Sequence, residues 1–255
     1  MEMKMQMKLK ENKQNEQAEN KENLGQYVAV DSDILRRLAY LDLLKNKNNN
    51  YVERSQINDD ILVKDFNYFL RMLNHIQEGN VKLVIVDAVY QESKHSANLL
   101  KFMNTYCYFP NVNAKNYQDK MEKARVLAHA YCQPYIYEGK EYCAPMKFVY
   151  VADIKKYVPT NDAYIMAQAT VEDCCLLTGN KQDFIFNKKD GIGNRSRLIG
   201  ICRINEMFGY YETRADGVFM SKPLTLSKMM GLLRSKEEFG IMNQSQDKVQ
   251  GGMTL

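Results

Sequence analysis

The sequence lacks several features that mark common protein classes. It has no apolar run near the roughly 18 residues that a membrane-spanning helix needs. Its opening stretch, MEMKMQMKLK, has no apolar core of the kind that secretory signals carry. None of its six cysteines forms a C-x-x-C pair, and two of them are adjacent within an apolar run. We therefore expect reduced cysteines in a cytoplasmic protein that has no membrane partner.

Composition and charge leave many functions open. The chain of 255 residues is 45% hydrophobic and 26% charged, which is the balance of an ordinary globular protein. Its formal net charge of +4 permits a polyanionic partner such as a nucleic acid but does not require one. The function therefore has to be inferred from the order and context of particular residues.

The two ends of the chain differ from its middle. Residues 1–24 are rich in Lys, Glu, Gln and Asn and contain no aromatic residue, so burial cannot offset the entropy lost on ordering them. Methionines alternate with polar residues at the start of this segment, which is also the pattern of a half-buried edge strand. We expect mobile tails at 1–24 and 241–255. Residues 25–240 contain no repeat or clear linker and are expected to form one domain.

Short apolar runs alternate with amphipathic segments between the tails. Residues 27–31 (YVAVD) end in an acid, and residues 81–89 (VKLVIVDAV) and 174–179 (CCLLTG) are typical of buried strands. This alternation predicts a three-layer α/β/α domain around a mainly parallel sheet of about five strands. Further strands are expected at 147–151 and at either 197–204 or 217–226. Helices are expected at 33–45, 59–78, 91–103, 114–131, 163–172 and 224–239, and a hairpin at 135–145 turns at Glu138 and Gly139.

Four acidic residues follow strands or begin helices: Asp31, Glu92, Asp162 and Asp183. In open parallel sheets, ligands gather beyond the carboxyl ends of the strands. Four carboxylates drawn to that edge repel one another unless cations neutralise them, and oxygen ligands favour Mg²⁺ or Mn²⁺ over zinc. Taken singly, Asp31 or Asp162 is also explained as a helix cap, and Glu92 as a solvated helix residue.

A basic stretch follows the last of these acids. Its members are Lys181, Lys188, Lys189, Arg195, Arg197 and Arg203, with Tyr210 and Tyr211 close behind. Basic side chains contact a nucleic-acid backbone, and tyrosines stack on unpaired bases. An ordinary solvated loop explains the same residues equally well.

Four segments resemble, in their order, the motifs of the PIN-domain nucleases. They read VAVDSDIL, VDAVYQES, PTNDAYIMAQA and LLTGNKQDF. Residues 178–184 match the family's last motif, Thr-x-Asn-x-x-Asp-Phe, at every defined position. The resemblance covers about 27–32, 82–102 and 148–186. It implies an enlarged PIN-like domain with helical insertions near 45–80 and 104–146.

The resemblance also implies roles for individual residues. Asp31, Glu92, Asp162 and Asp183 are then the catalytic acids, which bind Mg²⁺ or Mn²⁺ for the hydrolysis of RNA. Thr178 and Asn180 support them by hydrogen bonds, and Asp33 assists or replaces Asp31. The toxin-type members of the family usually pair as dimers and have an antitoxin, so a homodimer and an antitoxin-like protein join RNA among the expected partners.

Two other functions stay open at this stage. Asn180 stands where many family members carry an acid, which favours a catalytically weak or inactive member that binds nucleic acid or serves as a scaffold. A structure-specific DNA nuclease is the other alternative, because the same metal chemistry cleaves both polymers.

Overall fold

The computed structural model describes residues 27–48, 51–185, 197–214, 217–220 and 222–233, with the side chains of 211–220 left out. The two expected tails lie outside the described residues, as do Lys188, Lys189 and Arg195. Within these ranges, no helix is both long and apolar enough to cross a membrane.

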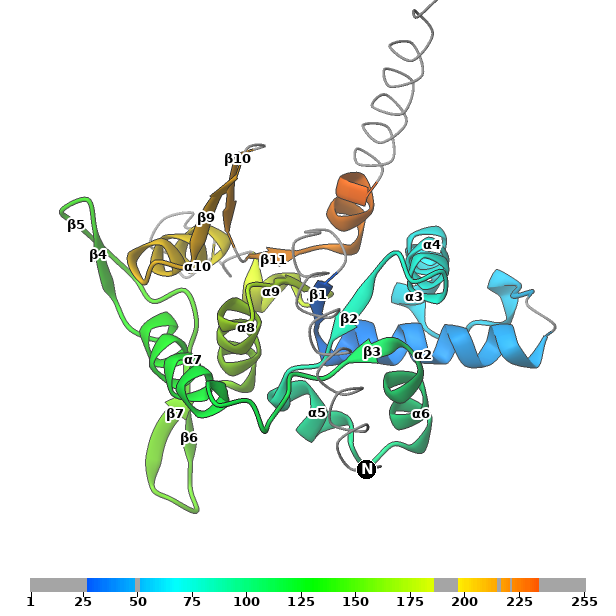
Figure 1. Cartoon of the computed structure of the whole chain (residues 1–255), viewed down its shortest axis with the longest axis horizontal. Helices are drawn as coiled ribbons and strands as arrows, with labels where there is room; N and C mark the ends of the chain where they lie inside the picture. Colours follow the sequence, from blue (N-terminus) through cyan, green and yellow to red (C-terminus); the bar gives the residue numbers. More distant parts are fainter. Residues whose placement is uncertain (1–26, 49–50, 186–196, 215–216, 221, 234–255) are drawn as a thin grey trace, which may run out of the picture.

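A five-stranded parallel sheet forms the centre of the protein (Figure 1). Its strands are β1 (Tyr27–Val30), β2 (Lys82–Val84), β3 (Cys107–Tyr108), β8 (Cys175–Leu177) and β11 (Pro223–Leu224). They lie in the order β11-β8-β1-β2-β3, and each neighbouring pair is parallel. Val28 pairs with Leu83 on one side and Cys175 on the other. The strand order therefore reverses between β1 and β8.

Helices cover both faces of this sheet. On one side α2 (Ser32–Lys47) packs against α4 (Phe66–Gln77) and α6 (Ala97–Tyr106). On the other, α8 (Asn161–Val171) packs against α7 (Tyr117–Tyr131) and α5 (Asp87–Ser93), and Figure 1 shows the central strands between the two groups. The predicted three-layer α/β/α fold is thus confirmed. The remaining helices are η2 (Arg54–Gln56), α3 (Asp60–Lys64), α9 (Lys181–Phe184), α10 (Arg197–Met207) and an unlabelled one at 226–233.

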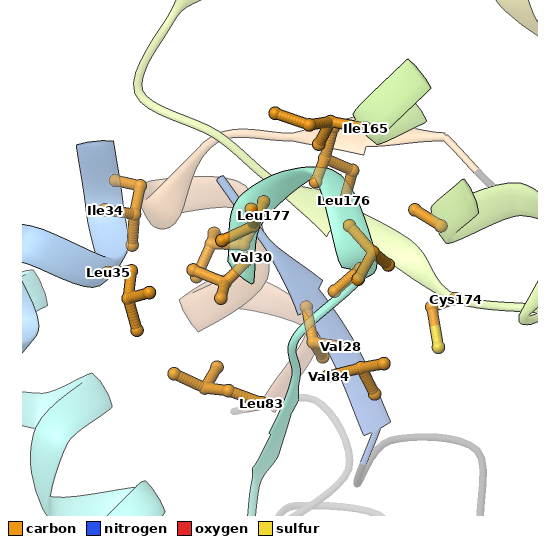
Figure 2. Packing of buried hydrophobic residues seen from close by; sticks show 14 of the residues in the cluster. Val28, Val30, Ile34, Leu35, Leu83, Val84, Ile165, Cys174, Leu176 and Leu177 are labelled. Carbon is orange, nitrogen blue, oxygen red and sulfur yellow. The ribbon is translucent and has the colours of Figure 1, made fainter. Parts of the chain in front are cut away.

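The core explains why the apolar runs form inner strands. Val30, Leu83 and Leu177 come from three adjacent strands and are almost completely buried. Figure 2 shows them beside Leu35 of α2, with Ile165 of α8 among the same packed side chains. Burial of one such side chain contributes about 1.5–3 kcal/mol to folding. A strand that is covered on both faces reads as a continuous apolar run, which is the pattern of 27–31 and 174–179.

The described residues also form three two-stranded hairpins outside the central sheet: β4 (Tyr135–Tyr137) with β5 (Lys140–Tyr142), β6 (Phe148–Val151) with β7 (Lys156–Pro159), and β9 (Tyr211–Arg214) with β10 (Gly217–Met220). The first confirms the predicted turn. Glu138 and Gly139 both have positive φ, at 49° and 72°, as a two-residue turn between antiparallel strands requires. The first two hairpins project from the body of the protein in Figure 1.

Two strand predictions were wrong in position. Residues 147–151 were expected in the parallel sheet, but β6 pairs antiparallel with β7, and β3 is the strand next to β2. Residues 197–204 were one candidate for the fifth strand, but they begin helix α10, whose buried Ile201 and Ile204 are three residues apart on one face. The edge strand β11 lies in the other candidate, 217–226.

Two expected helices are divided. The helix predicted over 59–78 is interrupted at Asp65, between α3 and α4. The strand predicted over 81–89 ends at Val84, so α5 begins at Asp87 and a second helix, α6, starts after Ser96. The hydroxyl of Ser96 accepts the N–H of Leu99, which caps that helix. The early start of α5 brings Glu92 into its last turn rather than its first.

Candidate active site

The site begins where β1 and β8 end. Asp31 directly follows β1, and Thr178 directly follows β8. The Asp31 N–H donates to the carbonyl of Leu177 at 2.9 Å, so parallel pairing continues to the last residue before each loop. This is the carboxyl edge of the sheet at the point where the strand order reverses, which is where ligands bind in open α/β sheets.

The carboxylate of Asp31 faces Thr178 rather than its own helix. Asp31 precedes α2, yet its side chain makes no capping hydrogen bond. Its Oδ2 instead accepts from Thr178 Oγ1 at 2.8 Å, and both residues are buried. Burial raises the pKa of Asp31, and the charges of Asp33 and Glu92 raise it further, whereas the Thr178 hydroxyl and the backbone N–H of Asp33 lower it. Helix capping alone therefore does not explain the contact of Asp31 with Thr178.

Asp162 lies where the charges of the other three acids meet. Thr160 is the cap of α8, and its hydroxyl accepts the N–H of Ala163, so Asp162 is not needed for that purpose. Burial raises the pKa of Asp162 to about 6, and Asp31, Asp183 and Glu92 contribute to the shift in that order while Arg197 opposes it. A Coulomb interaction of this kind requires short distances. The charges of three acids from other segments of the chain therefore reach Asp162 at this edge of the sheet.

Glu92 joins the beginnings of two helices. One of its carboxylate oxygens accepts from the hydroxyl of Ser32, the first residue of α2. The other accepts from the side-chain amide of Asn161, the first residue of α8. These contacts hold Glu92 beside Asp31 and Asp162, each of which is adjacent in sequence to one of the two donors. Glu92 is exposed, as a solvated helix residue would be, but these two contacts connect it to the starts of α2 and α8.

The segment TGNKQDF connects the acids by a chain of hydrogen bonds. The Asn180 N–H donates to Thr178 Oγ1 at 3.0 Å, and its Oδ1 accepts the N–H of Asp183 at 3.2 Å. The Asn180 amide donates to Asp183 Oδ2 at 2.9 Å and to Asp162 Oδ2 at 3.4 Å. An acid at position 180 would add to the repulsion between these carboxylates, whereas the amide relieves it.

Arg197 occupies a different position from the one predicted. It was expected on an exposed basic stretch, but it is only 7% exposed, and its guanidinium binds Asp183 Oδ1 at 3.1 Å. Arg203 also has a local partner, since it lies over the rings of Tyr137 and Tyr142. Lys181 is exposed on α9. Of the three basic residues of this stretch that the structure describes, two therefore have partners within the protein and one is exposed.

Asp33, the expected auxiliary acid, is neutralised by arginines. Its two carboxylate oxygens accept from Arg36 at 2.7 Å and from Arg37 at 2.6 Å. Burial opposes ionisation, but the hydrogen bonds and charges of Arg37 and Arg36 prevail and lower the pKa of Asp33. Arg37 also binds Asp59 at 3.1 Å. Asp33 therefore has cationic partners of its own beside the cluster.

The chemistry of the cluster suits a hard divalent cation. Within the described ranges, no three His, Cys, Asp or Glu side chains form a ready group of metal ligands. All four acids are held by neighbouring side chains, and the pKa values of Asp31 and Asp162 are raised first by burial and then by the nearby carboxylates. Mg²⁺ keeps several waters and needs only one or two direct carboxylates. Asp31 and Asp162 fit that requirement.

Ser32 and Asn161 were not predicted as contributors to the site, and Arg197 was predicted as a nucleic-acid contact rather than as a partner of Asp183. Ser32 and Asn161 are adjacent in sequence to Asp31 and Asp162, and this adjacency was the one available signal. Comparisons of the chain with models of protein families, with curated proteins and with solved structures found no match. The resemblance to PIN nucleases therefore rests on the motifs.

Proposed function

We propose that the protein is a metal-dependent phosphodiester hydrolase of PIN type that cleaves RNA. The observation that supports this function most strongly is the environment of Asp162. Its pKa is raised to about 6 by burial and by three further carboxylates at the reversal of the strand order. Such a concentration of like charge opposes folding unless it serves to bind a cation, and it is a frequent mark of a functional site.

In this proposal the protein's residues hold the acids in place. Thr178 orients the carboxylate of Asp31, and Asn180 orients those of Asp162 and Asp183. Ser32 and Asn161 fix Glu92 from two helix starts. When Mg²⁺ or Mn²⁺ is bound, it supplies neutralisation of the phosphate charge and a water of lowered pKa. The fixed carboxylates then require little rearrangement during hydrolysis.

RNA cleavage by wild-type protein and Asp162→Asn is the direct test. We expect cleavage of single-stranded RNA with Mn²⁺, none with a chelator, and a loss of about 100-fold or more in the variant. Asp153→Asn is the matched control, because Asp153 is an exposed acid between β6 and β7. The proposal fails if wild-type protein leaves diverse RNAs intact with Mn²⁺, or if Asp162→Asn cleaves as well as the control.

One observation favours the non-cleaving alternative. Each of the four acids accepts a hydrogen bond from a neighbouring side chain, and Asp183 is also paired with the cation of Arg197. RNA binding that weakens with salt, without cleavage in any metal, would identify such a protein. A parallel assay on flap DNA distinguishes a structure-specific DNA nuclease from a ribonuclease. The homodimer and the antitoxin-like partner remain predictions of the family resemblance, and the cytoplasmic location remains a prediction from the composition of the sequence.

A further inference from the structure

A second site lies at the same edge of the sheet, beyond β2 and β3. It is a cavity of about 360 Å³ whose wall includes Ile85 and Val86 after β2 and Phe109 and Pro110 after β3. This volume is within the range of small-molecule pockets. None of the four acids of the cluster lines it. The cavity is therefore separate from the site described above.

Gln168 presents a buried donor to this cavity. The residue lines the cavity and is only 5% exposed. Its Oε1 accepts the N–H of Ala88 at 2.9 Å, which fixes the amide orientation because an N–H requires an oxygen. No acceptor for its Nε2 is found among the described residues. A buried amide that lacks an acceptor is unfavourable, so the group indicates a ligand that carries one.

Asp87, which directly precedes Ala88, adds a hydrogen-bond acceptor to the cavity wall. Its Oδ1 accepts from Gln91 at 3.1 Å, and within the described ranges no cation pairs with it. The other carboxylate of the wall, Glu172, is bound by Lys120 at 2.8 Å. Burial first, and then the charges of Asp87 and Glu172, raise the pKa of Tyr117. Asp87 is therefore near the ring of Tyr117 and available to a donor on a ligand.

The rest of the wall is suited to a flat ring. Tyr90 and Phe109 meet edge to face with their centroids 6.0 Å apart, and Tyr117 adds a third aromatic side chain. Aromatic side chains stack on planar heterocycles, and they stack on each of the nucleic-acid bases. An aliphatic ligand would leave the Gln168 amide without an acceptor, and a simple amine would use Asp87 alone. A planar ring with an acceptor beside an N–H donor satisfies both.

We propose that this cavity binds a nucleobase, with a ring carbonyl or ring nitrogen on the Gln168 amide and an N–H on Asp87. The cavity and the acid cluster are joined by α5 and α8, which contact each other through Ala88 and Gln168 at one end and Glu92 and Asn161 at the other. Asp87 and Glu92 are separated by about 7.5 Å along the helix axis. The base comes from a free nucleotide or from an RNA strand that reaches the cluster, and only the second source rests on the proposed function.

Binding without metal tests the cavity apart from cleavage. GMP, AMP, CMP and UMP, and then short oligoribonucleotides, are titrated in a chelator and followed by NMR or calorimetry. Val112→Trp fills the cavity from a wall residue that is 61% exposed, and Val126→Trp is the control at an exposed valine of α7 outside the wall. Asp87→Asn removes the acceptor charge at an exposed position.

We expect at least one mononucleotide to bind at millimolar concentration or below, with a loss of about tenfold or more in Val112→Trp and in Asp87→Asn but not in the control. Tighter binding of oligoribonucleotides identifies a strand as the source, and equal binding identifies the free nucleotide. The proposal is overturned if no nucleotide or oligoribonucleotide binds, or if both cavity variants bind as the control does. Neither result depends on whether the acid cluster cleaves RNA.

Discussion

Two groups of acids lie side by side at the start of α2, and they are treated in opposite ways. Asp33 and Asp59 are paired with Arg36 and Arg37, and the pKa of Asp33 is lowered. Asp31, two residues before Asp33, has a raised pKa and lies with Asp162 among further carboxylates. Acidic side chains that stabilise a fold are paired with basic side chains of the same protein. A group that leaves its charge largely uncompensated is organised for a cation from outside.

The largest expected effect distinguishes the two groups by activity. Asp162→Asn should reduce cleavage of RNA by about 100-fold or more, because the variant has one fewer charged ligand for the ion. Its fold should become more stable at neutral pH, since the substitution removes a partly buried charge and its repulsion with the other acids. Initial cleavage rates and thermal unfolding of the same preparations measure both. A variant that is inactive because it is unfolded would show no such gain in stability.

The pH dependence of metal binding is the next effect. With a pKa of about 6, Asp162 is protonated in the metal-free protein below that pH. Affinity for Mn²⁺ should therefore fall by up to about tenfold for each pH unit below 6, as one proton competes with the ion. Calorimetry between pH 5 and 7 would detect this slope. In Asp162→Asn, the affinity for Mn²⁺ should no longer fall in this way below pH 6. If it falls as in wild-type protein, another acid is responsible for the pH dependence.

The protonation of Asp162 also makes the stability of the fold depend on pH. The pKa of Asp162 is about 6 in the folded protein and 3.8 in the absence of perturbation, so the folded state binds more protons between these values. Its contribution to stability is present below about pH 4 and is lost as pH rises to about 6. Asp33 has a lowered pKa and contributes in the other direction, with stability lost as the solution becomes acidic.

Thr178→Val should have a smaller effect on function than Asp162→Asn. The valine removes the hydroxyl that donates to Asp31 and accepts from the Asn180 N–H. We expect a decrease of about tenfold in Mn²⁺ affinity and a loss of about 1–3 kcal/mol in the free energy of unfolding. Thr105→Val is a matched control on the exposed face of α6. Unchanged Mn²⁺ affinity in Thr178→Val would mean that Asp31 does not need this support.

Asp33→Asn should have the smallest effect. The ion pairs of Asp33 are partly exposed, with 36% of its side chain accessible, so their loss should reduce the free energy of unfolding by only about 0.5–1 kcal/mol. Cleavage should remain within about twofold of wild type, because the comparison of the two groups assigns Asp33 to the fold. A loss of activity as large as that of Asp162→Asn would place Asp33 in the metal site and end the distinction.

The predictions were correct where the local sequence alone determines the structure of a segment. Strands β1 and β8 are short apolar runs covered on both faces, and the TGNKQDF segment forms its hydrogen bonds among its own residues and with nearby acids. Strand β3 was missed because it has only two residues, too few to show a pattern. Residues 147–151 have the composition of an inner strand but pair with their neighbour in a hairpin.

Contacts between distant segments could not be predicted. Arg197 was assigned to a basic surface because its neighbours in sequence are basic, whereas its position is decided by Asp183 and by burial against the fold. The wall of the cavity beyond β2 and β3 comes from the loops after these strands and from four helices, and no local pattern marks Gln168 as a wall residue. Motifs located the acids, but only the fold showed which charges are compensated.

Titration of metal-free protein with Mn²⁺, followed by electron paramagnetic resonance at neutral pH, is the most direct test of the acid cluster. The account predicts saturable binding by wild-type protein, a loss of about tenfold or more in Asp162→Asn, and wild-type binding in Asp33→Asn. Absence of saturable binding, or equal binding by all three proteins, would contradict it.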